Sequence, residues 1–147
     1  MPTYLFCDNE APNIYDAMGL FYGEGWTFRE LCCAIGAVGP FDAYWGLKIG
    51  RDILEGPIHP YPPGDDRLNQ HRHCEWACEL TRRLGGDEAW SLMECHERFP
   101  AHDDGSDDTE RDRQNNIIGI VIGEDNPGDP PSCYDLCKDA VDDGFTE

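Results

Sequence analysis

The stretch NQHRHCEWACELTRRLGG, residues 69–86, carries a clear helical pattern. His73, Trp76 and Leu80 follow one another at intervals of three and four residues, which places them on one face of a helix. Two glycines then end the pattern, because glycine readily takes the backbone conformation that closes a helix. We therefore predict an amphipathic helix over residues 69–84.

Five further helices are predicted from the same period and from capping signals. Thr27 with Glu30, and Ser132 with Asp135, have the spacing of a capping box, which marks the start of a helix. Asp87 can cap another helix that stops before Pro100. The predicted helices cover residues 27–37, 40–56, 69–84, 87–99, 108–123 and a last segment from 132 onward, and residues 57–66, with four prolines, form a rigid connector.

The predicted fold is therefore all-α, a compact bundle of about six helices. Residues 1–26 show no helical period and are expected to be an extended linker, with residues 27–147 as the domain. The helix after residue 108 carries a small polar face, and an Ile/Val run makes most of its other faces apolar. That composition predicts a central helix, although such a run can also form a strand.

Composition limits the functions to be considered. The chain has 147 residues, enough for one domain, and a formal net charge of −19, which repels phosphate backbones. No nucleic-acid partner is expected, whereas a basic partner, such as a neutralising protein, fits the charge. The alternative is that the acidity only maintains solubility. No stretch reaches the roughly 18 apolar residues of a membrane span, and the N-terminus lacks the pattern of a signal peptide.

Eight cysteines indicate a covalent or metal-bound framework. Cys74 and Cys78 are four residues apart, as are Cys133 and Cys137, so each pair shares one helical face. Two such helices packed antiparallel could be joined by two disulfides or could present four thiolates to one zinc ion. The other four cysteines show no comparable spacing.

Polar side chains on three helices are candidates for a functional site. Burial of such groups is costly unless they are paired, so we expect them to meet in one cluster. His73, His96, Glu97 and Asp112 can bind a metal or perform acid–base chemistry, and Asn115 or Asn116 could orient a substrate carbonyl or a water molecule. The alternative is a hydrogen-bonded clamp that only fixes the packing of the helices. The identity of any metal or cofactor stays open.

The N-terminal segment resembles the end of the core of Rhs/YD-repeat proteins. The matching residues are Tyr4, Asn9, Pro12, Asp16, Gly19 and Leu20, and Ala17 stands where the family has proline. In such proteins the segment that follows this motif is a variable, often toxic, C-terminal domain. The resemblance implies a bacterial effector that is secreted or delivered with its parent Rhs shell, together with an immunity protein as partner.

The second half of the chain resembles a family of uncharacterised helical domains found at the C-termini of polymorphic-toxin proteins. Its motifs are matched over residues 69–144 by Arg72-His73 with Trp76, by His96-Glu97, and by Asp112 with Asn115, Asn116 and Gly119, while Asn69 stands where the family has aspartate. The resemblance implies a shared site, with Arg72 and Trp76 as candidate substrate contacts. Two functions follow as hypotheses: an enzymatic toxin, such as a hydrolase, or a non-catalytic effector that binds a protein or inserts residues 32–50 into a membrane.

Overall fold

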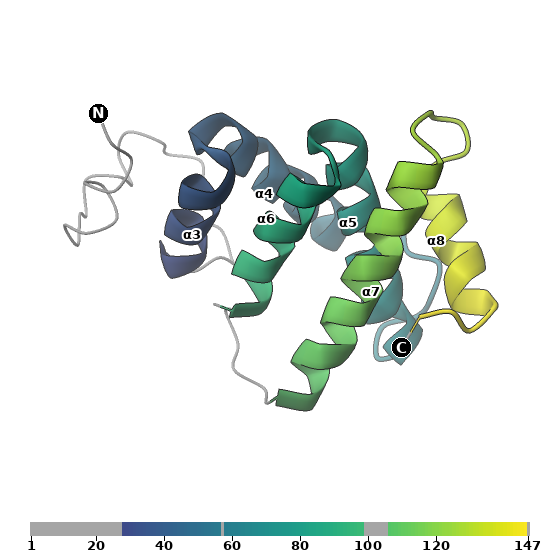
Figure 1. Cartoon of the computed structure of the whole chain (residues 1–147). Helices are drawn as coiled ribbons and strands as arrows, with labels where there is room; N and C mark the ends of the chain where they lie inside the picture. The colour runs from purple at the N-terminus through teal and green to yellow at the C-terminus, as the bar shows by residue number, and fades with distance from the viewer. Residues whose placement is uncertain (1–27, 57, 99–105, 147) are drawn as a thin grey trace.

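The computed structural model describes residues 28–56, 58–98 and 106–146, which form six α-helices and no strand (Figure 1). The predicted all-α class is confirmed. The linker predicted over residues 1–26 and the cap predicted at Thr27 lie outside the described residues. The helices are α3 (Phe28–Val38), α4 (Pro40–Glu55), α5 (Asp66–Leu84), α6 (Gly86–Arg98), α7 (Ser106–Asp125) and α8 (Cys133–Asp142).

Single glycines join two of the helix pairs. Gly39 lies between α3 and α4 with φ of +84°, and Gly85 lies between α5 and α6 with φ of +93°. Only glycine adopts these angles without strain, so each reversal needs a single residue. The N–H of Gly85 donates to the Thr81 carbonyl at 2.9 Å, and its own carbonyl accepts from the Ala89 N–H at 3.0 Å. One residue thus ends α5 and begins α6.

The helix starts differ from the predicted ones where a better cap lies upstream. The prediction that Asp87 caps α6 is wrong, because Gly85 takes that position and Asp87 falls inside the first turn. α5 begins three residues before Asn69, because the Asp65 side chain accepts from the Arg67 N–H at 2.9 Å. The predicted cap at Ser132 is confirmed, with its hydroxyl oxygen 3.0 Å from the Asp135 N–H.

α5 lies at the centre of the bundle and packs against α4, α6, α7 and α8. The prediction that α7 would be central is therefore wrong, although its Ile/Val run is helical rather than a strand. α7 lies against α5 through its small polar face and leaves Ile117 and Val121 39% and 49% exposed. The physical reason is that glycines and asparagines let α7 approach α5 closely. Ile118, Ile120 and Ile122 then pack against the buried clusters on either side, and Ile117 and Val121 point outward.

A hydrophobic core fills the space between α3, α4, α5 and α6. Eleven buried residues form it: Leu31, Ala34, Ile35, Ala43, Leu47, Trp76, Ala77, Leu80, Ala89, Leu92 and Met93. A second buried cluster, on the other side of α5, consists of Cys74, Cys78, Cys133 and Cys137 with Ile118 and Ile122 of α7 packed against it. The two clusters leave α5 with few exposed positions.

Disulfides join α5 to α8, as one of the two predicted arrangements requires. Cys74 is bonded to Cys137 and Cys78 to Cys133, each pair with Cα atoms 5.8 Å apart. The crossed order shows that the helices are antiparallel, and the bonded sulfurs offer no thiolates to zinc, which excludes the zinc alternative. A third disulfide, Cys33–Cys95, ties α3 to α6 and was not predicted. Such bonds persist in oxidising surroundings, so they point to an oxidising compartment.

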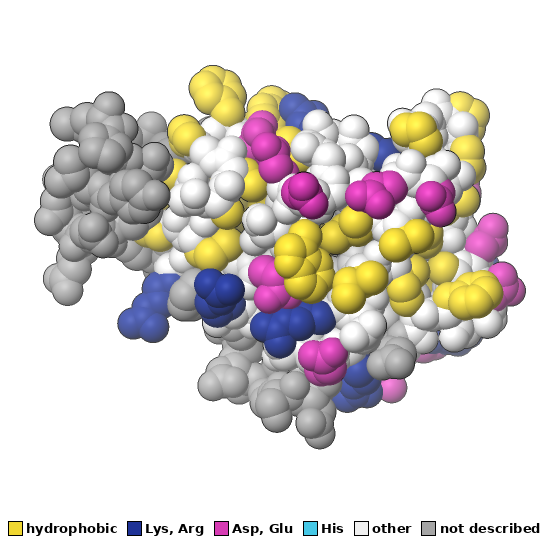
Figure 2. All heavy atoms as spheres, in the orientation of Figure 1, with side chains coloured by type: hydrophobic (Ala, Val, Ile, Leu, Met, Phe, Trp, Pro, Cys, Tyr) yellow, Lys and Arg dark blue, Asp and Glu magenta, His cyan; other side chains and the backbone are white. Residues whose placement is uncertain are grey.

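The surface combines acidic and apolar side chains. Figure 2 shows hydrophobic side chains gathered over α6 and α7 with acidic side chains beside them. Within the described ranges, no helix has the length and apolar character needed to cross a bilayer.

Candidate functional site

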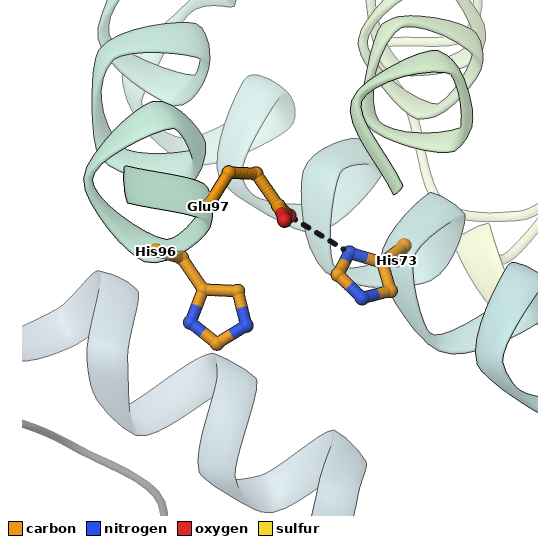
Figure 3. Close-up of side chains that lie close together, drawn as sticks. All are labelled: His73, His96 and Glu97. Atoms are coloured by element: carbon orange, nitrogen blue, oxygen red, sulfur yellow. Dashed lines mark ion pairs between the residues drawn. The ribbon is translucent and has the colours of Figure 1, made fainter. Parts of the chain in front are cut away.

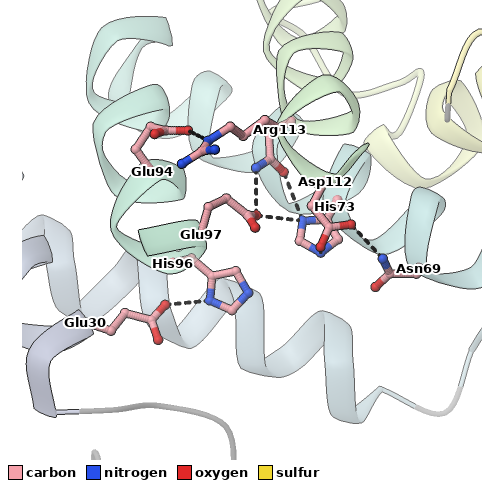
Figure 4. Close-up of polar contacts among 9 residues, drawn as sticks. Glu30, Asn69, His73, Glu94, His96, Glu97, Asp112 and Arg113 are labelled. Atoms are coloured by element: carbon pink, nitrogen blue, oxygen red, sulfur yellow. Dashed lines mark hydrogen bonds and ion pairs between the residues drawn. The ribbon is translucent and has the colours of Figure 1, made fainter. Parts of the chain in front are cut away.

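Three helices place polar side chains at one point between them. His73 comes from α5, Glu97 from α6, and Asp112 and Asn116 from α7 (Figure 4). We call these four residues the polar cluster. His73 and Glu97 are buried, Asn116 is fully buried, and the side chain of Asp112 is 18% exposed. The structure thus brings together residues that lie far apart in the sequence.

The ring of His73 is held on both of its nitrogens. Nδ1 donates to the Asn116 Oδ1 at 3.0 Å and lies 3.3 Å from Glu97 Oε1. Nε2 lies 3.4 Å from Asp112 Oδ2 on the opposite side of the ring. One imidazole therefore stands between two carboxylates that belong to two other helices.

Asn116 joins the two sides of the polar cluster. Its Nδ2 donates to Glu97 Oε1 at 3.0 Å while its Oδ1 accepts from His73. Asn116 comes this close because Gly119, one turn later on α7, lies directly against the backbone of α5. The small residues of α7 therefore set the geometry of the cluster.

The electrostatics of the polar cluster favour charged forms of its central pair. Burial lowers the pKa of His73, but the hydrogen bond to Glu97 and the charges of Asp112 and Glu97 outweigh it, so its pKa lies above the usual range. Burial raises the pKa of Glu97, but its contacts with His73 outweigh that effect and the net pKa is lowered. Burial raises the pKa of Asp112. An imidazolium–carboxylate pair is the expected resting state.

His96, the remaining histidine of the motif, lies beside the polar cluster. Its Nδ1 donates to Glu30 Oε1 at 2.6 Å, and its ring packs edge-on against Trp76, with centroids 4.9 Å apart. Its side chain is 20% exposed, so the site meets solvent at this edge. The rings of His96 and His73 have centroids 5.9 Å apart.

Glu30 is a site residue that the sequence reasoning missed. It is 1% exposed and comes from α3, outside the motif-bearing half of the chain. Its spacing from Thr27 is that of a capping box, so nothing in the sequence near Glu30 indicates its contact with His96. The Cys33–Cys95 disulfide explains its position, because Cys33 lies one turn after Glu30 and Cys95 directly precedes His96. The covalent bond holds the two helices where the carboxylate meets the imidazole.

The other predicted site residues have different surroundings. Trp76 is in the core, where its Nε1 donates to the Gly46 carbonyl at 2.9 Å. Arg72 is half-buried, with Nη2 3.5 Å from His59 Nε2. Substrate contact by these two residues stays a prediction. Asn115 is 1% exposed but points to a different side of α7 from Asn116, because successive helical residues are about 100° apart.

Flanking contacts fix the helices around the polar cluster. Asn69 Nδ2 donates to Asp112 Oδ1 at 2.8 Å, so Asn69 of α5 also contacts the site. One turn before Glu97, Glu94 accepts from Arg113 Nε at 2.9 Å, which pairs α6 with α7 outside the cluster.

His73, His96 and Glu97 also form a donor set for a metal ion. One ligand atom from each lies within 4.8 Å of the others (Figure 3). Two imidazoles and a carboxylate are ligands that zinc and other divalent transition metals take in proteins.

Comparison with protein-family models, with curated proteins and with solved structures finds no match to this chain. The assignment of function therefore depends on the geometry of the site and on the sequence motifs that converge there.

Proposed function

We propose that the chain carries the effector domain of an Rhs-type protein and that the domain is a hydrolase centred on the polar cluster. The observation that carries the proposal is the position of His73, whose ring nitrogens face the carboxylates of Glu97 and Asp112. A histidine fixed in orientation by carboxylates is a recurrent acid–base group of hydrolases, and in the imidazolium form it acts first as the general acid.

Each surrounding residue has a role in this proposal. Glu97 and Asp112 hold the imidazole and complement its charge, and Asn116 keeps Glu97 in place. His96 supplies a second imidazole at the solvent-facing edge, where a substrate bond could enter. Buried hydrogen bonds and nearby disulfides fix the positions of these side chains. A site whose side chains are already in place needs little reorganisation during the reaction, which favours catalysis.

The substrate class is limited by charge. A net charge of −19 opposes the approach of nucleic acids, and so the proposed substrate is not a nucleic acid. We therefore propose an ester or amide bond of a neutral or cationic target as the substrate. The same charge favours a basic immunity protein as the neutralising partner.

Expression in bacteria tests the effector role. The domain is produced in the cytoplasm or exported to the periplasm, each with and without the product of the gene adjacent to its own. Growth arrest that the adjacent product relieves is the expected result. Normal growth in both compartments would contradict the effector role.

A second function, binding without catalysis, is favoured by one observation. Within the segment of residues 32–50, Phe41 is 80% exposed and Trp45 is 36% exposed on α4. Exposed aromatic side chains of this kind are typical of contact surfaces. If this face is the active one, Phe41→Ser abolishes growth arrest while substitutions in the polar cluster leave it intact.

A further inference from the structure

We propose that His73, His96 and Glu97 bind one divalent transition-metal ion, with zinc as the best match. This proposal extends the proposed function. Only the role of the ion in catalysis rests on that function. The binding site itself follows from geometry that does not require the domain to be an enzyme.

The first argument is the spacing of the donor atoms. His73 Nδ1 and Glu97 Oε1 are 3.3 Å apart. A tetrahedral zinc ion with bonds of about 2.0–2.1 Å separates its ligand atoms by about 3.3 Å, so these two atoms already have the spacing of neighbouring ligands. The donor atom of His96 completes the set within 4.8 Å and lies on a half-buried ring.

The second argument is the orientation of the two imidazoles. Glu30 accepts from Nδ1 of His96, so this carboxylate fixes one side of the ring. Asp112 faces Nε2 of His73, and Nδ1, which donates to Asn116 Oδ1, lies on the side of Glu97. Figure 4 shows the Glu30 carboxylate on the side of the His96 ring that faces away from His73. A carboxylate on the distal nitrogen is what metal-binding histidines commonly have in proteins, because it fixes the ring and raises its basicity.

The third argument is charge. Three carboxylates, those of Glu30, Glu97 and Asp112, surround two imidazoles, and Glu30 and Glu97 are both buried. A buried excess of negative charge is stabilised by a cation. Imidazole ligands favour zinc over calcium or magnesium, which take oxygen ligands. On binding, the ion replaces the proton of His73 Nδ1, which passes to solvent, and the hydrogen bond from this nitrogen to Asn116 Oδ1 is lost.

Titration of zinc chloride into the full, disulfide-bonded chain tests the inference after dialysis against EDTA. Calorimetry gives the stoichiometry, and spectra of chain labelled with ¹⁵N-histidine show which imidazoles change. We expect one ion per chain, with large shifts for His73 and His96. His59, half-buried outside the site, and buried His71 are internal controls that keep their shifts. No binding, or shifts at the controls instead, would overturn the proposal.

Variants give a second, independent readout. Glu30→Gln removes a carboxylate that does not contact the ion, and zinc affinity should fall about 10–100-fold, as is usual for such outer contacts. His96→Asn should reduce zinc affinity further, and His59→Asn should leave it unchanged. Equal affinities for all three variants and the wild type would refute the site. The spectra of the unsubstituted chain decide the matter if a variant does not fold.

The two proposals fail separately. Zinc bound at His73 and His96 without any growth arrest would support the metal site and contradict the hydrolase. If the chain binds no zinc and its growth arrest nevertheless requires Glu97, the metal site is contradicted and the hydrolase proposal is retained.

Discussion

Gly119 of α7 lies directly against the carbonyl oxygen of Cys74 on α5, at the level where His73 and Asn116 meet. A Cβ atom at this position would also lie 2.8 Å from Ala77 Cβ, closer than such atoms approach. Gly119→Ala should therefore separate α7 from α5 and lower the free energy of unfolding by about 1–3 kcal/mol. Chemical denaturation measures the change.

Gly36→Ala is the matched control for this prediction. Gly36 is an exposed helical glycine with no atom near a Cβ at its position. Alanine there should raise stability by up to about 1 kcal/mol, because alanine has the higher helix propensity. If both substitutions have the same effect, the close approach of α7 does not depend on Gly119.

The disulfides between α5 and α8 should supply much of the stability of the domain. Cys74 and Cys137 are separated by 63 residues, but Cys78–Cys133 still closes most of that loop, so removal of the outer bond alone costs about 2–3 kcal/mol. The variant in which both Cys74 and Cys137 are replaced by alanine should have a correspondingly lower melting temperature. An unchanged melting temperature, or free thiols in the protein recovered from an oxidising compartment, would show that the bond does not form.

A contact between two helices is predictable from the sequence only where a pattern within a short stretch of the chain indicates it. That Cys74 and Cys78 face Cys133 and Cys137 is predictable from the sequence, because the two cysteines of each pair are one helical turn apart. Cys33 and Cys95 have no such repeat, so their bond is visible only once α3 and α6 are placed side by side.

The same limit applies to the candidate site. His73, Glu97, Asp112 and Asn116 stand out as polar residues on faces that have to be buried, and the structure brings them together. Glu30 does not stand out, because its contact with His96 spans 66 positions and its local spacing has another explanation. The outward position of Ile117 and Val121 is not predictable from the sequence either, because it depends on how closely Gly119 and Gly123 bring α7 to α5.

Tyr61 should tie the connector to α8 in a pH-dependent way. Its hydroxyl donates to Asp142 Oδ1 at 2.6 Å, and the pKa of Asp142 is lowered by its hydrogen bonds with Lys138 and then with Tyr61. A lowered carboxyl pKa contributes stability above its unfolded value of 3.8, and that contribution is lost as the pH falls through the folded value. Tyr61→Phe should therefore lower the melting temperature at neutral pH.

The difference between Tyr61→Phe and the wild type should narrow below about pH 4, where the carboxyl group starts to become protonated. Melting curves of both proteins across the acidic range provide the check. A difference that stays constant down to the lowest pH would mean that the contact of the hydroxyl with the Lys138 carbonyl, and not its bond to Asp142, accounts for the loss.

The most direct test of the catalytic centre compares Glu97→Gln with Glu94→Gln. Both residues are on α6, one turn apart, and each pairs with a basic side chain, but only Glu97 contacts His73. Both variants keep the shape of the side chain and lose its charge. Growth arrest and melting temperature are measured for each, with the amount of folded protein in the cells determined alongside.

If the polar cluster is catalytic, Glu97→Gln abolishes growth arrest at a level of folded protein at which Glu94→Gln remains fully active. Glu97→Gln also loses about 1–3 kcal/mol of stability through its buried contacts, which is why activity is compared per folded molecule. A folded Glu97→Gln protein that arrests growth as strongly as the wild type would contradict the account.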